Sequence, residues 1–448
     1  MKNYYLFLLI LIIINSQAQC WQKITAANDY SVLTKSDGTT WSAGSNTYYN
    51  NFPSNNPTLV TSSINWNQLS SGPWTTIGIK TDGTLWGWGY NGYGQLGISN
   101  ALPESSIPIQ IGTDTNWQHI SVGEVHVVGI KTDGTLWSWG EDWYGALGNG
   151  SSSNTFTPTQ IGTSNNWKTV STGPYETLAI KTDGTLWGWG RNFYGQLGNG
   201  TTSNSEIPIQ IGTSNNWLSL SSGDNHTLAI KTNGTIWAWG ANYGGQLGNG
   251  TNNNSNVPIQ IGTSNNWAKI ESGGSHSLAI KTDGTLWIWG FNYYGQIGSG
   301  NTNNVLSPIQ IGSQNNWLDI SAGFRHSLAL NSNNTLWAWG NNINFQLANG
   351  NSIDLSVPTE IQNCTLNVNS NVKPNFTIYP NPSINELHLD YHRDIDLQKV
   401  TIYDLNGKKV IEKHNNFNVI NIEFLQRGIY LIKLETNTTV ITEKLIKK

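Results

Sequence analysis

One unit of about 50 residues recurs seven times along this chain of 448 residues, and this repetition restricts the fold more than any other feature. Each unit opens with a tryptophan, and the gaps between successive opening tryptophans are 45, 51, 50, 50, 50 and 50 residues. The opening residues are Trp21, Trp66, Trp117, Trp167, Trp217, Trp267 and Trp317. A period of this length is typical of propellers and solenoids, in which each repeat buries the face of its neighbour.

The unit that begins near Trp217 shows the internal pattern. Apolar and polar residues alternate in Asn216–Ser221, His226–Thr232 and Thr235–Gly240, and Pro258–Ile261 follows a long polar loop. Alternation with a period of two, bounded by Gly and Asn, predicts four strands. An Asp-Gly or Asn-Gly pair between the second and third strands of six units is a strong hairpin signal. Four antiparallel strands, repeated seven times, predict an all-β, seven-bladed β-propeller.

These residues also resemble the regulator of chromosome condensation repeat. Residues 273–300 read Gly-x-x-His-Ser-Leu-Ala-Ile-Lys-Thr-Asp-Gly-Thr-Leu-Trp-x-Trp-Gly and continue to Gly-Gln-Ile-Gly, and the resemblance extends over about residues 21–363. The first unit departs from it, because its third strand lacks the second Trp. The resemblance implies a fold and not a function. The nuclear protein that names the family activates a small GTPase and binds chromatin through an inserted wedge and basic surfaces, which this chain lacks, so we expect neither activity.

The repeat region is acidic and carries few charges. Residues 21–363 include 11 basic and 18 acidic side chains, a net charge of −7, whereas residues 375–448 include 10 basic and 9 acidic side chains. Proteins that bind nucleic acid neutralise phosphates with basic patches, so we expect no nucleic acid partner. The low charge, together with 22 Trp and 48 Gly, indicates an extracellular, mostly β protein.

The N-terminus has the features of a secretory signal peptide. Lys2 precedes the apolar run Tyr4–Ile14, and the small residues that follow predict cleavage after Ala18. Lipidation of Cys20 is an alternative, although the residues before it do not match those that lipid attachment requires. No other stretch is apolar enough to cross a bilayer, so we expect no transmembrane segment in the mature chain.

The two cysteines flank the predicted propeller. We expect a signal peptide over residues 1–18, a propeller over 19–364, a linker over 365–374 and a C-terminal domain over 375–448. If the ring closes, Cys20 and Cys364 fall in the same connection between the last and first blades. We therefore predict a Cys20–Cys364 disulfide in this exported chain. A lipidated Cys20 with a free Cys364, or two unpaired thiols, are the alternatives.

The last 74 residues follow a different pattern. Six alternating runs predict a small Ig-like β-sandwich. Its motifs Tyr-Pro-Asn-Pro, Tyr-Asp-Leu-Asn-Gly-Lys and Gly-Ile-Tyr-Leu-Ile, with a basic end, resemble the type A sorting domain of the type IX secretion system. The resemblance rests on Tyr379, Pro380, Pro382, Gly407, Gly428, Tyr430 and Lys448. It implies that the type IX machinery carries the chain across an outer membrane, followed by release or attachment to the cell surface. An Ig-like module without a sorting role is the alternative.

Two loops vary between the units, one after the first strand and one after Trp-x-Trp-Gly. In an antiparallel blade both connections lie on the same face, so the variation gathers on one rim. The candidate ligand-binding residues there are Trp74, Trp143, Tyr175, Arg191, Phe324 and Arg325. Aromatic and arginine side chains are common in recognition sites. Neutral variation of exposed loops would give the same pattern.

We find no motif for catalysis, a metal or a cofactor. Four histidines share one column of the repeat: His126, His226, His276 and His326. Each belongs to a different blade, so we expect them to satisfy polar groups at blade junctions rather than to share a metal ion. The two tryptophans of Trp-x-Trp-Gly are expected in the core. The Asn-rich loops, such as residues 251–256, lack the carboxylates that a calcium site needs.

The sequence thus favours a secreted or surface-attached, non-catalytic propeller that binds a protein or a glycan through its variable face. A secreted polysaccharide hydrolase is the alternative. It would need a convergent pair of acids on that face, and the candidates are Glu124, Glu141, Asp142 and Glu176. A surface component without a specific ligand is the third possibility.

Overall fold

The computed structural model describes residues 21–45, 54–62, 64–99, 102–361, 377–390, 396–405, 407–436 and 440–448. The chain forms two compact units, one containing the described residues up to 361 and one containing those from 377 onward. The predicted signal peptide with Ala18, the linker, Cys20 and Cys364 lie outside the described residues. Signal cleavage and the disulfide therefore stay predictions.

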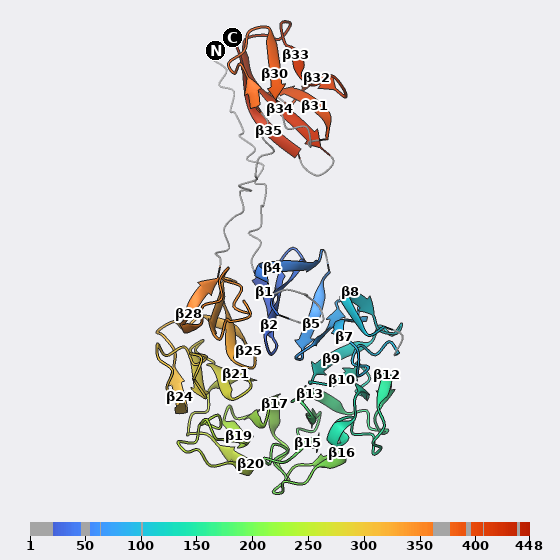
Figure 1. The fold of residues 1–448 in the computed structure, drawn as a ribbon, viewed down its shortest axis with the longest axis vertical. Helices are drawn as coiled ribbons and strands as arrows, with labels where there is room; N and C mark the ends of the chain where they lie inside the picture. The colour runs from blue at the N-terminus through green and yellow to red at the C-terminus, as the bar shows by residue number, and fades with distance from the viewer. Residues whose placement is uncertain are drawn as a thin grey trace, which may run out of the picture. The chain divides into compact units, whose positions relative to one another are not determined.

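The first unit is a ring of seven blades around a central axis, and each blade is one four-stranded antiparallel sheet formed by one repeat (Figure 1). Blades 1 to 3 contain β1 (Trp21–Ala26), β2 (Tyr30–Lys35), β3 (Thr40–Gly44), β4 (Ser54–Thr61); β5 (Trp66–Ser71), β6 (Thr75–Lys80), β7 (Leu85–Tyr90), β8 (Glu104–Gln110); β9 (Trp117–Val122), β10 (His126–Lys131), β11 (Leu136–Gly140), the 3-10 turn η1 (Trp143–Gly145) and β12 (Thr155–Gln160). Blades 4 and 5 contain β13 (Trp167–Thr172), β14 (Glu176–Lys181), β15 (Leu186–Gly190), β16 (Ser205–Gln210); β17 (Trp217–Ser222), β18 (His226–Lys231), β19 (Ile236–Gly240) and β20 (Ser255–Gln260). Blades 6 and 7 contain β21 (Trp267–Ser272), β22 (His276–Lys281), β23 (Leu286–Gly290), β24 (Val305–Gln310); β25 (Trp317–Ala322), β26 (His326–Asn331), β27 (Leu336–Gly340) and β28 (Leu355–Ile361). The predicted seven-bladed propeller is confirmed.

The predicted hairpin turns join the second and third strands. In blade 5 the Asn233 carboxamide accepts hydrogen bonds from the amide and the hydroxyl of Thr235, at 3.2 and 2.7 Å. Gly234 follows with φ 77°, a left-handed conformation that glycine adopts without strain. A Cβ at Gly234 would also lie 2.0 Å from the carbonyl oxygen of Asn265. The second position of this turn therefore favours glycine for two separate reasons.

The two tryptophans of each Trp-x-Trp-Gly segment differ in their surroundings. Trp239 is fully buried, and its indole N–H donates a 2.8 Å hydrogen bond to Gln196 O of the preceding blade. Trp237 is only half-buried, although it packs against the same core cluster. Its N–H donates to the Thr235 hydroxyl, and the Lys231 ammonium lies 4.2 Å from its ring centroid. We expected both tryptophans to be buried in the core. The structure shows this for the second tryptophan of the segment, Trp239, and not for the first, Trp237.

The recurring histidines connect neighbouring blades. His226 is fully buried, and its Nε2 lies 3.0 Å from the Ser277 hydroxyl of the next blade. That hydroxyl donates its proton to Gln246 O, so the ring nitrogen is the donor. Burial lowers the pKa of His226 to about 3, and the ring is neutral. The corresponding pairs are His126–Thr177, His276–Ser327 and His326–Ser31. Their predicted role at blade junctions is confirmed.

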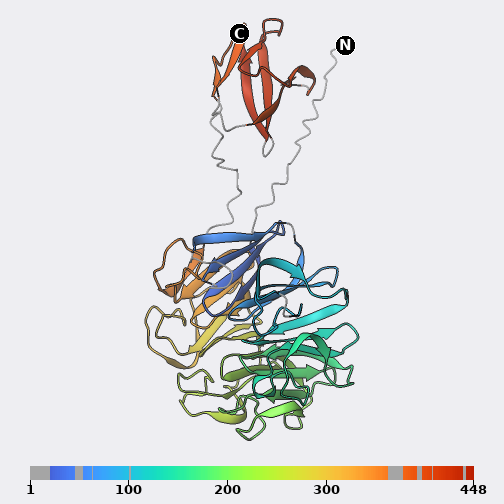
Figure 2. The ribbon, with the colours of Figure 1, turned by 45° about the vertical axis from the view of Figure 1, so that its right-hand side comes forward.

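The same contacts close the ring. Blade 7 lies beside blade 1 (orange and blue in Figure 1 and in Figure 2), and each of these sheets is made from a single repeat. The Ser31 hydroxyl of blade 1 donates to Gln346 O of blade 7, and Ala26 N donates to the Ser321 hydroxyl. Blades 7 and 1 are therefore held together by hydrogen bonds and packing between their side chains. Neither blade borrows a strand from the other.

Glycines after the first strands let the blades approach the axis. A Cβ added to Gly223 would lie 2.4 Å from Gly273 O of the next blade, which is closer than real contacts allow. Five other blades have the same glycine, namely Gly72, Gly123, Gly173, Gly273 and Gly323. Backbone therefore packs on backbone around the mouth of the central channel.

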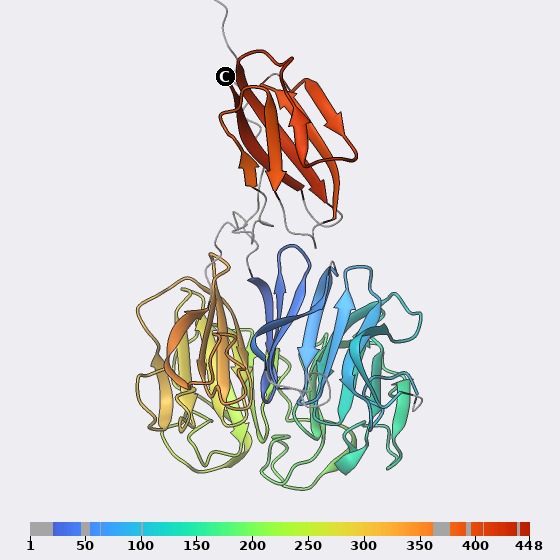
Figure 3. The same ribbon diagram turned by 45° about the horizontal axis from the view of Figure 1, so that its top comes forward.

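The second unit is a β-sandwich (red and orange in Figure 3). Its strands are β29 (Thr377–Tyr379), β30 (Glu386–Asp390), β31 (Leu397–Asp404), β32 (Lys409–Lys413), β33 (Val419–Asn421), β34 (Gly428–Thr436) and β35 (Val440–Lys447). They form one sheet in the order β29-β30-β33 and another in the order β32-β31-β34-β35. Leu387, Val400, Ile402, Ile420 and Ile432 are fully buried in its core. The predicted Ig-like sandwich is confirmed.

Candidate ligand-binding face

The two variable loops of blades 2 to 4 meet on one face of the propeller. Trp74 lies in the loop between β5 and β6, and Tyr93 in the loop between β7 and β8. Their ring centroids are 6.4 Å apart. In blades 3 and 4, η1 brings Trp143 to 5.6 Å from Tyr175 of the β13–β14 loop. Loops that are distant in the sequence thus form a single surface.

This surface carries a continuous row of aromatic rings, which we call the aromatic belt. Its members are Trp74, Tyr90, Tyr93, Trp143, Tyr144, Tyr175 and Phe193. Adjacent ring centroids lie 5.3 to 6.4 Å apart in tilted or edge-on arrangements. Three side chains remain well exposed, namely Trp143 at 43%, Tyr144 at 42% and Phe193 at 54%. An exposed, contiguous aromatic surface is a mark of recognition.

A polar group adjoins the belt on the axial side. The guanidinium of Arg191 lies 5.1 Å from the Tyr175 ring centroid, and it donates hydrogen bonds to Asp224 O at 3.2 Å and to the Asn225 side chain. Burial, with a smaller contribution from the hydrogen bond to Glu124, raises the pKa of Tyr175. Tyr175 is therefore a neutral phenol, held between a cation and a carboxylate.

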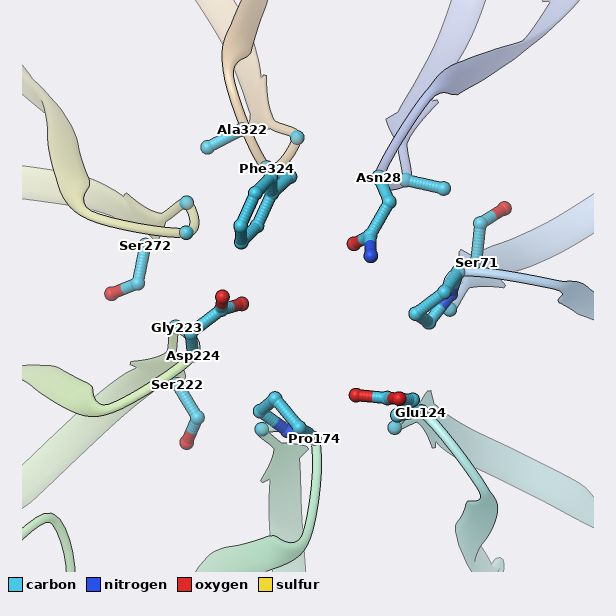
Figure 4. Close-up of a pocket in the computed structure, with 18 of the residues that line it drawn as sticks. Asn28, Ser71, Glu124, Pro174, Ser222, Gly223, Asp224, Ser272, Ala322 and Phe324 are labelled. Atoms are coloured by element: carbon cyan, nitrogen blue, oxygen red, sulfur yellow. The ribbon is translucent and has the colours of Figure 1, made fainter. Parts of the chain in front are cut away.

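The belt borders the mouth of the central channel. A cavity of about 370 Å³ opens there, lined by the axial glycines and by the loops of all seven blades. Figure 4 shows the carboxylates of Glu124 and Asp224 pointing into this opening, with Phe324 at its rim. Burial in the channel wall raises the pKa of Asp224 to about 7, with a further contribution from Glu124. The size is within the range of small-ligand sites.

The four acids considered for hydrolysis do not gather on the face. Glu176 is fully buried in the histidine column, and burial raises its pKa to about 8. Asp142 is 5% exposed and accepts a hydrogen bond from Leu147 N inside its own loop. Neither carboxylate can reach a polymer on the surface. Glu124 does point into the mouth, but its carboxylate neighbour there is Asp224, which the sequence reasoning did not single out.

Of the six predicted ligand-face residues, Trp74, Trp143 and Tyr175 are in the belt, and Arg191 packs on it. Phe324 and Arg325 belong to blade 7 instead. The Arg325 guanidinium lies 4.8 Å from the ring centroids of both Phe324 and Tyr294, which makes a second, smaller aromatic group. The structure thus divides the six residues between two sides of the channel mouth.

Sequence reasoning missed Tyr93, Tyr144 and Phe193. It compared only the residues directly after the first-strand Gly and directly after Trp-x-Trp-Gly, and these three lie further along their loops. The pattern Asn-x-Tyr-Gly or Asp-x-Tyr-Gly that recurs in blades 2, 3, 4 and 6 was a usable signal. Only the closeness of the blades shows that these rings form one row.

The Tyr-Pro-Asn-Pro segment and the basic end meet at one edge of the second unit. The Tyr379 ring stacks on His388, and Pro380 and Pro382 flank Asn381, whose side chain bonds Lys444 O and Ile446 N at 2.7 and 2.9 Å. The main-chain N–H of the terminal Lys448 donates to Ser383 O at 2.8 Å. Elsewhere, Gly407 turns with φ 78°, Gly428 begins β34, and the hydroxyl of Tyr430 donates to Gln426 O.

The fold is a closed propeller with an exposed aromatic face, and the repeats identify its family. Residues 82–130, 133–180, 183–230, 233–280 and 283–330 match the Regulator of chromosome condensation (RCC1) repeat, and a second pattern of the same description matches from residue 66 to residue 346 in five segments. The chain belongs to this family.

Residues 377–448 match the secretion system C-terminal sorting domain, which indicates export to the cell surface or the medium.

Solved structures agree on the fold. Human WBSCR16 is 21% identical, with a TM-score of 0.62, covering 68% of this chain and 84% of that one. Prp20p from Saccharomyces cerevisiae, described with its binding properties to Gsp1p and histones, is 18% identical, with a TM-score of 0.63, covering 81% of this chain and 90% of that one. No curated protein matches the chain. Among the residues placed by the structure, no helix is long and apolar enough to cross a membrane.

Proposed function

We propose that this protein is an exported, non-catalytic propeller that binds an extended glycan along the aromatic belt. The observation that carries the proposal is the row of seven rings across blades 2 to 4, with exposed faces at Trp143, Tyr144 and Phe193. Aromatic rings contact the C–H faces of sugars through dispersion and their π-systems. A row of rings suits a chain of several sugars better than a compact ligand.

The polar groups beside the belt suit the same ligand. Arg191, Glu124 and the hydroxyl of Tyr175 provide donors and acceptors next to the rings, as hydroxyl-rich ligands require. Asp142 and Glu176 give a hydrolase no support, because both carboxylates are buried away from the face. The sorting tail supplies the route to the outside, where polysaccharides are found.

Affinity electrophoresis in gels that contain soluble polysaccharides tests this function. The exported protein is expected to be retarded by at least one polysaccharide, and the Trp143→Ala variant is expected to migrate freely. Tyr293→Ala is the matched control, because Tyr293 is a 68% exposed aromatic side chain on blade 6 and lies outside the belt. Equal retardation of all three proteins, or cleavage of the polysaccharide, would contradict the proposal.

A further inference from the structure

A buried asparagine organises the loop after the third strand in five blades. In blade 4 the carboxamide N–H₂ of Asn192 donates to Asn199 Oδ1, Thr201 O and Ser203 O, at 3.1, 3.1 and 3.0 Å. Its Oδ1 accepts from Leu197 N at 2.9 Å. The corresponding residues are Asn91, Asn242, Asn292 and Asn342. Three oxygen acceptors thus converge on one nitrogen in a typical loop of this kind.

Blade 3 has an aspartate, Asp142, in this position. One oxygen keeps its role, since Asp142 Oδ1 accepts from Leu147 N at 2.9 Å. The backbone N–H of Asp142 donates to Asn154 Oδ1 at 3.1 Å, as Asn192 N does to Asn204 Oδ1 at 2.9 Å. The remainder of the loop also follows blade 4, because Ser151 N donates to Asn149 Oδ1 at 2.8 Å.

The second carboxylate oxygen, Oδ2, takes the place of the carboxamide nitrogen. No group in the described part of the chain donates a hydrogen bond to it, although the residue is only 5% exposed. By correspondence with blade 4, the neighbouring groups are Asn149 Oδ1, Ser151 O and Ser153 O, all of them acceptors. An anionic oxygen among three acceptors has no partner for its charge, which is costly in a buried site.

Further negative charge lies close to the loop. Burial raises the pKa of Asp142 to about 6, with smaller contributions from the carboxylates of Glu206 and Glu141. A positive charge between Oδ2 and the three acceptors would satisfy all four oxygens at once.

We propose that this loop of blade 3 binds one calcium ion, held by Asp142, Asn149 and the main-chain carbonyls of Ser151 and Ser153. Ca²⁺ is a hard cation that accepts carboxylate, amide and main-chain oxygens together with water. Within the described ranges, no group of three or more His, Cys, Asp or Glu side chains could hold a metal. The site thus depends on one carboxylate and neutral oxygens, and a dissociation constant of about 10⁻⁴–10⁻³ M is expected, as in extracellular calcium modules.

This inference departs from the expectation that the chain holds no metal, and it does not depend on the proposed ligand. We based that expectation on the Asn-rich loops, which lack carboxylates. The proposed site is in the blade 3 loop, where Asp142 stands at the position of the buried asparagine. η1, which carries Trp143 and Tyr144, follows Asp142 directly. Calcium would therefore hold the central part of the belt in place.

Equilibrium dialysis with ⁴⁵Ca²⁺ at pH 7.5, on purified exported protein that was first stripped with EDTA, tests the site. We expect one ion per chain, and a melting temperature that rises on addition of millimolar Ca²⁺. The Asp142→Asn variant restores the amide of the other blades, so it is expected to bind no ion and to be at least as stable in EDTA as the wild type. Retained binding by this variant would overturn the proposal.

Asp133→Asn is the matched control. It removes one negative charge from the same blade at the exposed hairpin, where blade 5 already has Asn233 with the same contacts to the following Thr. This variant is expected to keep the ion. The proposal is wrong if neither the wild type nor the control binds Ca²⁺. It is also wrong if only a proton stabilises Asp142, in which case stability would fall as the pH rises from about 4 to 6, with no response to calcium.

Discussion

The blade joints and the ligand face are built from the same repeat. Their residues differ in how much they vary from one unit to the next. At the joints, four blades use a buried histidine and a hydroxyl of the next blade, and five use a buried Trp N–H and a carbonyl of the preceding blade. On the face, the corresponding loop positions hold Trp, Glu, Arg, Pro or Phe. The residues that recur between units therefore hold the blades together, and the residues that differ between units are candidates for ligand binding.

The largest expected effect concerns the axial glycines. Gly223→Ala places a Cβ 2.4 Å from Gly273 O, so two backbones must separate, and we expect a loss of about 3 kcal/mol in the free energy of unfolding. Gly188→Ala is the control, because its nearest neighbour would be 3.5 Å away and blade 5 has Ala238 at this position. Urea unfolding of both variants measures the difference. Equal stabilities would show that the axial contact does not constrain the ring.

A second prediction compares the two tryptophans of one strand. Trp239→Phe removes one of the two hydrogen bonds that Gln196 O accepts, leaving the one from the Thr227 hydroxyl, and it opens space in the core, so we expect it to cost about 2 kcal/mol. Trp237→Phe removes only a hydrogen bond to Thr235 at a half-buried site, and a cost below about 1 kcal/mol is expected. Thermal unfolding of the two variants decides the order, and the reverse order would refute the distinction between the buried and the half-buried tryptophan.

The third prediction concerns the blade in which a glutamate, Glu176, occupies the position of the recurring histidine. Burial raises the pKa of Glu176 to about 8, so this residue contributes stability at low pH that is lost as the pH rises from about 4.5 to 8. The buried histidines behave oppositely, since a pKa of about 3 at His276 means that stability is lost as the pH falls below 6.5. Glu176→Gln should reduce the alkaline loss, to which the raised pKa values of Asp224 and Glu271 also contribute in both proteins, and should leave the acid loss unchanged, as followed by melting temperature between pH 3 and 9. A wild type and variant with parallel profiles would argue against a neutral Glu176.

Local patterns in the sequence were enough to predict the blades and their joints. Alternation gave the strands, Asp-Gly pairs gave the hairpins, and the recurrence of His226 and its counterparts pointed to a shared structural role. The half-buried position of Trp237 was not predicted, because a period of two shows which face of a strand a residue takes but not how deeply its side chain is buried. The paired carboxylates at the channel mouth were also not predicted, because Glu124 and Asp224 are 100 residues apart and meet only across the closed ring.

The same reasoning explains why the site was predicted only in part. Trp74, Trp143 and Tyr175 attracted attention because they break the repeat, whereas Tyr93 and Tyr144 occupy a Tyr column that recurs in several blades. A residue that follows the period can still be functional when its neighbours on adjacent blades differ. The aromatic belt is therefore a property of the arrangement of three blades rather than of any one repeat.

The most direct test of the central claim is calorimetric titration with oligosaccharides of increasing length from the polysaccharide that the protein retains. If the glycan lies along the belt, affinity should rise with length until the chain spans the row and then level off. Trp74→Ala and Phe193→Ala, at the two ends of the row, should each weaken long oligosaccharides more than short ones. An affinity that does not change with length, or that neither substitution alters, would contradict a binding site along the belt.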